Sequence, residues 1–96
     1  MIFGTVAGTV VASVKSGSLP AAKYLLVRTC DQTGAPGKDW HVALDDLGAG
    51  PGELVILSQG SSARQTALTD KAPVDVVVVG IVDRIDEQGK SVYAKG

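Results

Sequence analysis

The residues of this chain that could carry out catalysis are few, and they form no recognisable catalytic motif. His41 is the only histidine, and Asp45 and Asp46 follow it, so a hydrolytic triad would need a serine such as Ser61 or Ser62. No nucleophile elbow surrounds either serine. A polar histidine on a strand explains His41 better than a catalytic base does, and we expect no enzymatic activity.

A metal site has equally little support in the sequence. Cys30, His41, Asp45 and Asp46 carry atoms that bind transition metals, but they lack the paired spacing of a CxxC or HxxxH motif. Because Cys30 is the only cysteine, no disulfide can form within the chain, which fits a reducing cytosol. We expect neither a metal ion nor a cofactor.

Residues 48–52, Gly-Ala-Gly-Pro-Gly, are the most distinctive stretch of the sequence. No Lys-Ser or Lys-Thr follows them, and they lead into an apolar strand segment, so they do not fit a phosphate-binding loop. We interpret them as a shaped turn where the backbone packs closely against a ligand or a second copy of the chain. Gly50 is expected at a positive φ or in a tightly packed position, so that Gly50→Val weakens assembly.

A second group of small and polar residues follows Gly60. Ser62 and Gln65 have the spacing of a capping box at the start of a helix. Free N–H groups there, together with Arg64, favour a small anion. A capped helix whose Arg64 pairs with a carboxylate, such as Asp45, Glu53 or Asp75, explains these residues better than an anion site does.

The composition limits the partners of the chain. Its 96 residues suit a single domain, residues 1–96, with a modest core. The apolar share of 45% is high beside an aromatic share of 4%, so part of the apolar surface is expected at subunit contacts. A net charge of -1 and the few aromatics argue against nucleic acid, and the charge also argues against an anionic membrane. No apolar run reaches the ~20 residues that span a bilayer.

The remaining sequence predicts β-strands. The first expected strand is rich in Val and Thr, with glycines that let it bend around a barrel, and residues 31–39 are expected to form a flexible hairpin loop. A short helix is expected to begin at Ser62 and to end before Pro73. This pattern predicts an all-β fold, a small OB-like five-stranded barrel with one short helix. Strands are expected at residues 2–14, 24–30, 40–44, 54–58 and 74–83, with a last short strand around Val92.

Four ordered motifs carry a resemblance to a known family. They read GTVAGTVVASVK at residues 4–15, DDLGAGPGE at 45–53, GSSAR at 60–64 and VDVVVVGIVD at 74–83. With these motifs the chain resembles the EutN/CcmL family, the vertex proteins of bacterial microcompartments. The resemblance implies a cyclic homopentamer that closes one vertex of a polyhedral shell in the bacterial cytoplasm. It also implies a structural role beside hexameric shell proteins, which build the facets.

The implied ring has candidate contact residues in these motifs. Close approach near a ring axis favours small residues, and one face of each subunit meets a different face of the next. Charge pairs between neighbours would set register and specificity. A small-ligand- or anion-binding barrel that uses Ser62 and Arg64 is the alternative function. The candidates for the pentamer interface or pore are Gly48, Ala49, Gly50, Gly52, Glu53, Gly60, Ser61, Ser62, Arg64 and Asp83.

Overall fold

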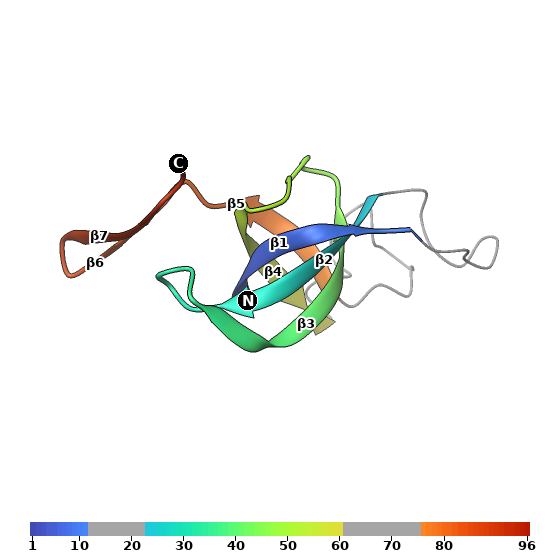
Figure 1. Cartoon of the computed structure of the whole chain (residues 1–96), viewed down its shortest axis with the longest axis horizontal. Coiled ribbons are helices and arrows are strands. Elements are labelled where there is room, and N and C mark those ends of the chain that lie inside the picture. Colours follow the sequence, from blue (N-terminus) through green and yellow to red (C-terminus); the bar gives the residue numbers. More distant parts are fainter. Residues whose placement is uncertain (12–22, 61–75) are drawn as a thin grey trace.

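The computed structural model describes residues 1–11, 23–60 and 76–96. In these residues the chain forms strands joined by turns, and the strands build a barrel with a separate two-stranded hairpin beside it (Figure 1). The barrel strands are β1 (Ile2–Val10), β2 (Lys23–Cys30), β3 (Pro36–Asp45), β4 (Leu54–Gln59) and β5 (Val76–Ile81). The hairpin strands are β6 (Arg84–Glu87) and β7 (Lys90–Ala94).

The barrel is closed, with the strand order β1-β2-β3-β5-β4 and with β4 returning to β1. Neighbouring strands run antiparallel except for β3 and β5, which are parallel and pair at Leu44 and Val77. The expectation of an all-β, five-stranded barrel is confirmed. The short helix expected between the fourth and fifth strands lies outside the described residues.

The barrel closes around the side chains that point to its inside. Successive residues of a strand point to opposite faces, so every second residue enters the core. Leu44, Leu54 and Val77 are each buried beside another buried residue of the same strand, but the strand residues of the main core cluster follow this period. Burying these apolar side chains removes apolar surface from water, which stabilises the fold. They include Val6 on β1, Leu25 and Val27 on β2, Ala43 on β3, Val55 and Leu57 on β4, and Val76 and Val78 on β5.

Strand β1 bends around the barrel, as its glycines predict. Its pairing with β2 shifts register between Val6 and Gly8, which marks a β-bulge. Gly4 is buried, and a Cβ there would overlap the Val27 side chain and lie 3.2 Å from the Arg28 carbonyl oxygen. Only glycine therefore fits at this crossing of β1 and β2.

Two segments differ from the sequence expectation. β3 begins at Pro36, earlier than expected, because the Asp31 carboxylate accepts hydrogen bonds from Thr33 and Ala35 and so folds a compact loop. Residues 84–94 form a complete hairpin where a single last strand was expected. Gln88 and Gly89 both have positive φ, 53° and 79°, which is the geometry of a two-residue type I′ turn.

Candidate functional site

A buried carboxylate fixes the conformation of the turn between β3 and β4. Asp45, at the end of β3, is 2% exposed. Its Oδ1 accepts a hydrogen bond from the Leu47 N–H at 2.9 Å, and its Oδ2 accepts one from the Ala49 N–H at 3.0 Å. Ala49 is fully buried in the core of its own chain. Both carboxylate oxygens of Asp45 therefore bind backbone N–H groups of this turn. The sequence motif alone does not reveal this role.

The second half of the turn is fixed to β1. The Glu53 N–H donates to the Gly50 carbonyl at 3.2 Å, with Pro51 and Gly52 in the middle positions and φ +87° at Gly52, as in a type II turn. The Gly52 N–H donates to the Val6 carbonyl at 2.8 Å, and the Val6 N–H donates to the Glu53 carbonyl at 2.9 Å. The turn is thus an ordered extension of the barrel wall.

The glycines of this turn have different roles. Gly48 and Gly52 have φ of +84° and +87°, a region that other residues rarely adopt. Gly50 does not have a positive φ, and a Cβ there would lie 3.6 Å from the Glu53 side chain, which is an ordinary contact. Within the single chain, the expectation that Gly50 needs a positive φ or sits in a tightly packed position is wrong. The positive φ values of this turn belong to Gly48 and Gly52.

The acidic candidates Glu53 and Asp83 lie together at this end of the barrel. Glu53 Oε2 pairs with Lys95 Nζ at 2.5 Å, and the Lys95 N–H donates to the Asp83 carbonyl at 2.8 Å. The hydrogen bond from Lys95, followed by one from the Gly50 N–H, lowers the pKa of the Glu53 carboxyl below its ordinary value. Glu53 thus already has a cationic partner within its own chain.

The other candidate residues lie elsewhere. Gly60 follows directly after β4, whereas Glu53 directly precedes it, so the length of β4 separates the two, roughly 20 Å for a strand of this size. Gly60 is exposed and has φ +66°. Ser61, Ser62 and Arg64 lie outside the described residues. The structure therefore brings Gly48, Gly50, Gly52, Glu53 and Asp83 to one end of the barrel and Gly60 to the other.

The outer face of β2 and β3 presents apolar side chains that sequence reasoning missed. Strand pairing sets Arg28 beside Trp40 and Leu26 beside Val42. Trp40 is 50% exposed and Val42 is 53% exposed. The signal in the sequence is their spacing of two residues, which places both on the same face of one strand. We call the surface formed by Leu26, Arg28, Trp40 and Val42 the β2–β3 face.

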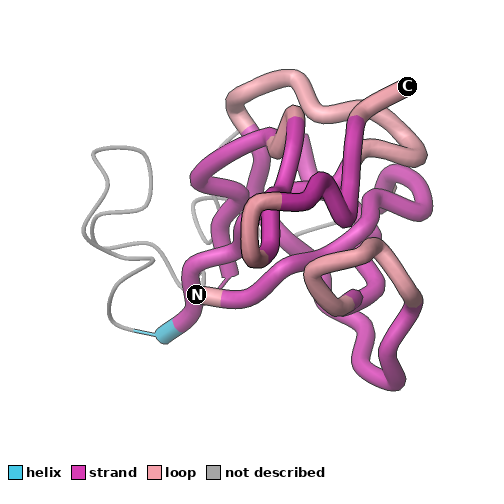
Figure 2. The backbone as a smooth tube through the Cα atoms, turned by 90° about the vertical axis from the view of Figure 1, so that its left-hand side faces the viewer, coloured by secondary structure: helices cyan, strands magenta, loops and turns pink. Residues whose placement is uncertain are grey.

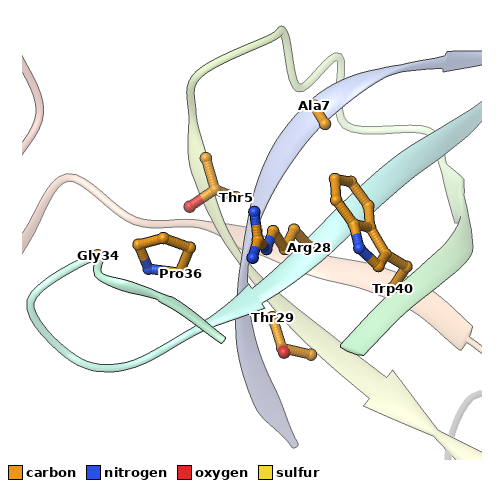
Figure 3. A pocket seen from close by; sticks show the side chains of 7 residues that line it. All are labelled: Thr5, Ala7, Arg28, Thr29, Gly34, Pro36 and Trp40. Atoms are coloured by element: carbon orange, nitrogen blue, oxygen red, sulfur yellow. The ribbon is translucent and has the colours of Figure 1, made fainter. Parts of the chain in front are cut away.

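A pocket of about 330 Å³ opens beside this face (Figure 3). The Arg28 guanidinium lies over the Trp40 ring at 5.3 Å, a cation–π contact, and its Nε donates to the Gly37 carbonyl at 2.9 Å. Thr5 and Ala7 of β1 line the same pocket. The pocket therefore offers a mostly apolar surface with one cation.

The β6–β7 hairpin, which we call the arm, projects from the barrel in Figure 1, and Figure 2 shows the molecule from the side on which the arm lies. It contacts the β2–β3 loop, where Tyr93 lies over Gly34 and the Gln32 side-chain amide donates to Glu87 Oε1 at 2.7 Å. Most of its other residues are exposed. The sequence expectation of a turn at residues 88–90 and a strand after it is correct, but the strand before the turn was not anticipated.

The described residues hold no arrangement typical of an enzyme or metal protein. His41 is half-buried on β3 opposite Val27. Within residues 1–11, 23–60 and 76–96, no three His, Cys, Asp or Glu side chains are grouped in a way that could hold a metal ion. In the same residues, no helix has the length and apolar character needed to cross a membrane.

Sequence relatives cover nearly all of the chain. The carboxysome shell vertex protein CcmL of Gloeobacter violaceus is 44% identical over 95 residues, which cover 99% of this chain and 95% of the relative. The bacterial microcompartment shell vertex protein EutN of Salmonella typhimurium is 42% identical over 95 residues, covering 99% of this chain and 96% of the relative.

Solved structures superimpose on this chain over most of its length. The structure of Gloeobacter violaceus CcmL superimposes with a TM-score of 0.92 at 44% identity and covers 99% of this chain and 98% of its own. The GrpN pentameric microcompartment shell protein of Rhodospirillum rubrum gives a TM-score of 0.80 at 42% identity, covering 91% of this chain and 99% of its own. A family profile described as ethanolamine utilisation protein EutN/carboxysome matches residues 1–83. The chain belongs to this EutN/CcmL family, as its four motifs predict.

Proposed function

We propose that this chain is a structural shell protein whose homopentamers cap the vertices of a bacterial microcompartment in the cytoplasm. The observation that carries the proposal is the close match to a solved pentameric shell protein, at 42% identity over 91% of this chain. Relatives of equal similarity are named as shell vertex proteins, which supports a structural role and not an enzymatic one.

The barrel suits a closed ring. A cyclic oligomer is built by one contact repeated around the axis, in which one surface of a subunit meets a different surface of the next. The β2–β3 face and the arm give the described residues two such different surfaces. A five-fold unit placed among six-fold tiles bends a flat layer, so we propose hexameric shell proteins as the partners of the pentamer.

Native mass spectrometry tests the ring directly. The expected species has five times the 9.8 kDa mass of the subunit. A chain that stays monomeric at high concentration would contradict the proposal. Electron microscopy of shells assembled from hexameric facet proteins tests the vertex role, because closed polyhedra are expected only when this chain is added. Closed shells formed equally well without it would refute that role.

The alternative of a small-ligand- or anion-binding barrel has no support. Ser62 and Arg64, on which it depends, lie outside the described residues. The relatives are named for their place in a shell and not for a ligand. We therefore take the shell role as the function of the chain.

A further inference from the structure

A short connection joins the arm to the barrel. β5 ends at Ile81 and β6 begins at Arg84, so Val82 and Asp83 alone connect the two strands. In the part of the chain that the structure describes, β6 and β7 pair with each other and with no barrel strand. A two-stranded hairpin without a further sheet beside it has little stability of its own. The direction of the arm therefore depends on contacts at its base.

Backbone hydrogen bonds fix only part of this base. The Val82 N–H donates to the Leu54 carbonyl of β4 at 2.8 Å, which ties the connection to the barrel. The Lys95 N–H donates to the Asp83 carbonyl at 2.8 Å, which ties the two ends of the arm to each other. The residue that follows β7 is bound to the barrel through its side chain, because Lys95 forms an ion pair with Glu53.

Glu53 is itself held firmly by the barrel. Its N–H donates to the Gly50 carbonyl at 3.2 Å, and its carbonyl accepts the Val6 N–H at 2.9 Å. Its Oε1 accepts the Gly50 N–H at 2.6 Å, and its Oε2 lies 2.5 Å from Lys95 Nζ. One carboxylate thus bridges the β3–β4 turn and the base of the arm.

The Glu53–Lys95 pair differs from an ordinary surface ion pair. Exposed pairs contribute little, because two long side chains must be ordered in water. The Arg84–Asp86 pair within β6 is of this kind, with side chains 68% and 45% exposed. The Glu53 side chain is 22% exposed and is already ordered by its hydrogen bond from Gly50. The hydrogen bond between the partners lowers the pKa of the Glu53 carboxyl and raises the pKa of the Lys95 amine, so both groups stay charged at neutral pH.

Contacts farther along the arm reach a loop and not the barrel wall. The Gln32 amide donates to Glu87 Oε1 at 2.7 Å, and both residues are exposed. A Cβ at Gly34 would lie 3.4 Å from the Tyr93 ring, so this ring lies against the same β2–β3 loop. The link through Glu53, in contrast, reaches the start of β4.

We propose that Glu53 is a positioning residue that acts as a latch: by binding Lys95 it fixes the direction in which the arm leaves the barrel. When the pair is broken, Val82 and Asp83 become a pivot and the arm takes a wider range of directions. The arm then no longer keeps the single direction that Figure 1 shows. This inference concerns the fold of one subunit, goes beyond the proposed shell role and does not depend on the ring.

Electron–electron double resonance tests the latch, because it measures the direction of the arm as a distance. Cys30→Ser removes the native thiol, and Thr9→Cys on β1 and Lys90→Cys on β7 then carry nitroxide labels at exposed positions. Labelled subunits are diluted with an excess of unlabelled subunits, so that each measured distance lies within one subunit in any oligomer. With the latch intact, we expect a narrow distance distribution.

Two variants open the latch. Lys95→Gln removes the cation and leaves the hydrogen bond from Gly50 in place, whereas Glu53→Gln removes the anion but keeps an oxygen that can accept this bond. We expect each variant to at least double the width of the distance distribution. Lys95→Arg keeps a cation and should keep the distribution narrow. The matched control is Arg84→Gln, which breaks an ion pair within the arm and should also keep it narrow.

The outcomes decide the inference. A narrow distribution in both Lys95→Gln and Glu53→Gln would mean that other contacts hold the arm, and it would overturn the latch. Equal broadening in Arg84→Gln would overturn it as well, because the effect would then not depend on this pair.

Hydrogen exchange separates an open latch from a disrupted turn. The Val6 amide, which donates to the Glu53 carbonyl, should keep its protection in Lys95→Gln. Broadening together with loss of this protection would count against the latch. The native mass decides the proposed function separately, because the measured distances report on one subunit whether or not it joins a ring.

Discussion

Removing the Asp45 carboxylate is expected to destabilise the subunit strongly. The two N–H groups that it accepts, at 2.9 Å and 3.0 Å, would lose their partner. The Ala49 N–H belongs to a fully buried residue, and an unsatisfied buried donor costs about 1–3 kcal/mol. The Leu47 N–H belongs to a half-exposed residue that can reach water, so its loss costs about 1 kcal/mol. Asp45→Ala should therefore lower the free energy of unfolding by about 2–4 kcal/mol.

Asp45→Asn is a finer version of this test. The amide oxygen can still accept one N–H, but the amide NH₂ then faces the other donor, so a loss of about 1–3 kcal/mol is expected. Denaturant unfolding at one fixed subunit concentration measures both variants, because association also contributes to stability. Hydrogen exchange should show lost protection at the Ala49 amide. Asp46→Asn, a change at the exposed neighbour, is the control.

The result that would refute this reasoning is specific. If Asp45→Ala unfolds within about 0.5 kcal/mol of the original chain, as a surface change would, the buried carboxylate does not organise the turn. Normal protection of the Ala49 amide in that variant would lead to the same conclusion.

Three further predictions follow from the geometry. Gly52→Ala, at φ +87°, should cost about 1–2 kcal/mol of unfolding free energy, whereas Gly50→Ala should be nearly neutral, and equal losses in denaturant unfolding would contradict this. Gly4→Ala should cost about 1–3 kcal/mol, because its Cβ would overlap the Val27 side chain; a melting temperature equal to that of the original chain would refute the overlap. The lowered pKa of Glu53 means that its ion pair stabilises the fold above the unfolded-state pKa and that this contribution is lost as the pH falls through the folded-state value. An NMR titration of the Glu53 carboxyl should therefore have its midpoint below the ordinary 4.5, and a midpoint at or above 4.5 would contradict the pairing.

The barrel could be predicted from the sequence because its strands carry strong local signals. The β-branched run of β5 and the glycines of β1 indicate strands and a bend without any knowledge of the partners. The arm was harder to predict. Only its turn, Gln88-Gly89, is distinctive, and the strand before it, Arg84–Glu87, is short and mostly charged.

The candidate site was harder to predict from the sequence, because long-range contacts determine which of its residues are buried or paired. Small residues in a turn indicate close packing but not what packs there. The burial of Ala49 in its own core and the pairing of Glu53 with Lys95 are long-range facts that no local pattern contains. The β2–β3 face depends on the register that sets Val42 beside Leu26, which is likewise absent from either segment alone.

The closed barrel also bears on colloidal behaviour. A sheet that closes into a barrel leaves few unpaired strand edges for another protein chain to pair with, and free edges are the usual templates for fibrils. In the described residues, β6 and β7 form a separate two-stranded sheet with open edges, and these four- and five-residue strands carry Arg84, Asp86, Glu87 and Lys90. Short, charged edges resist indiscriminate stacking, so many copies can crowd together without growing into amyloid.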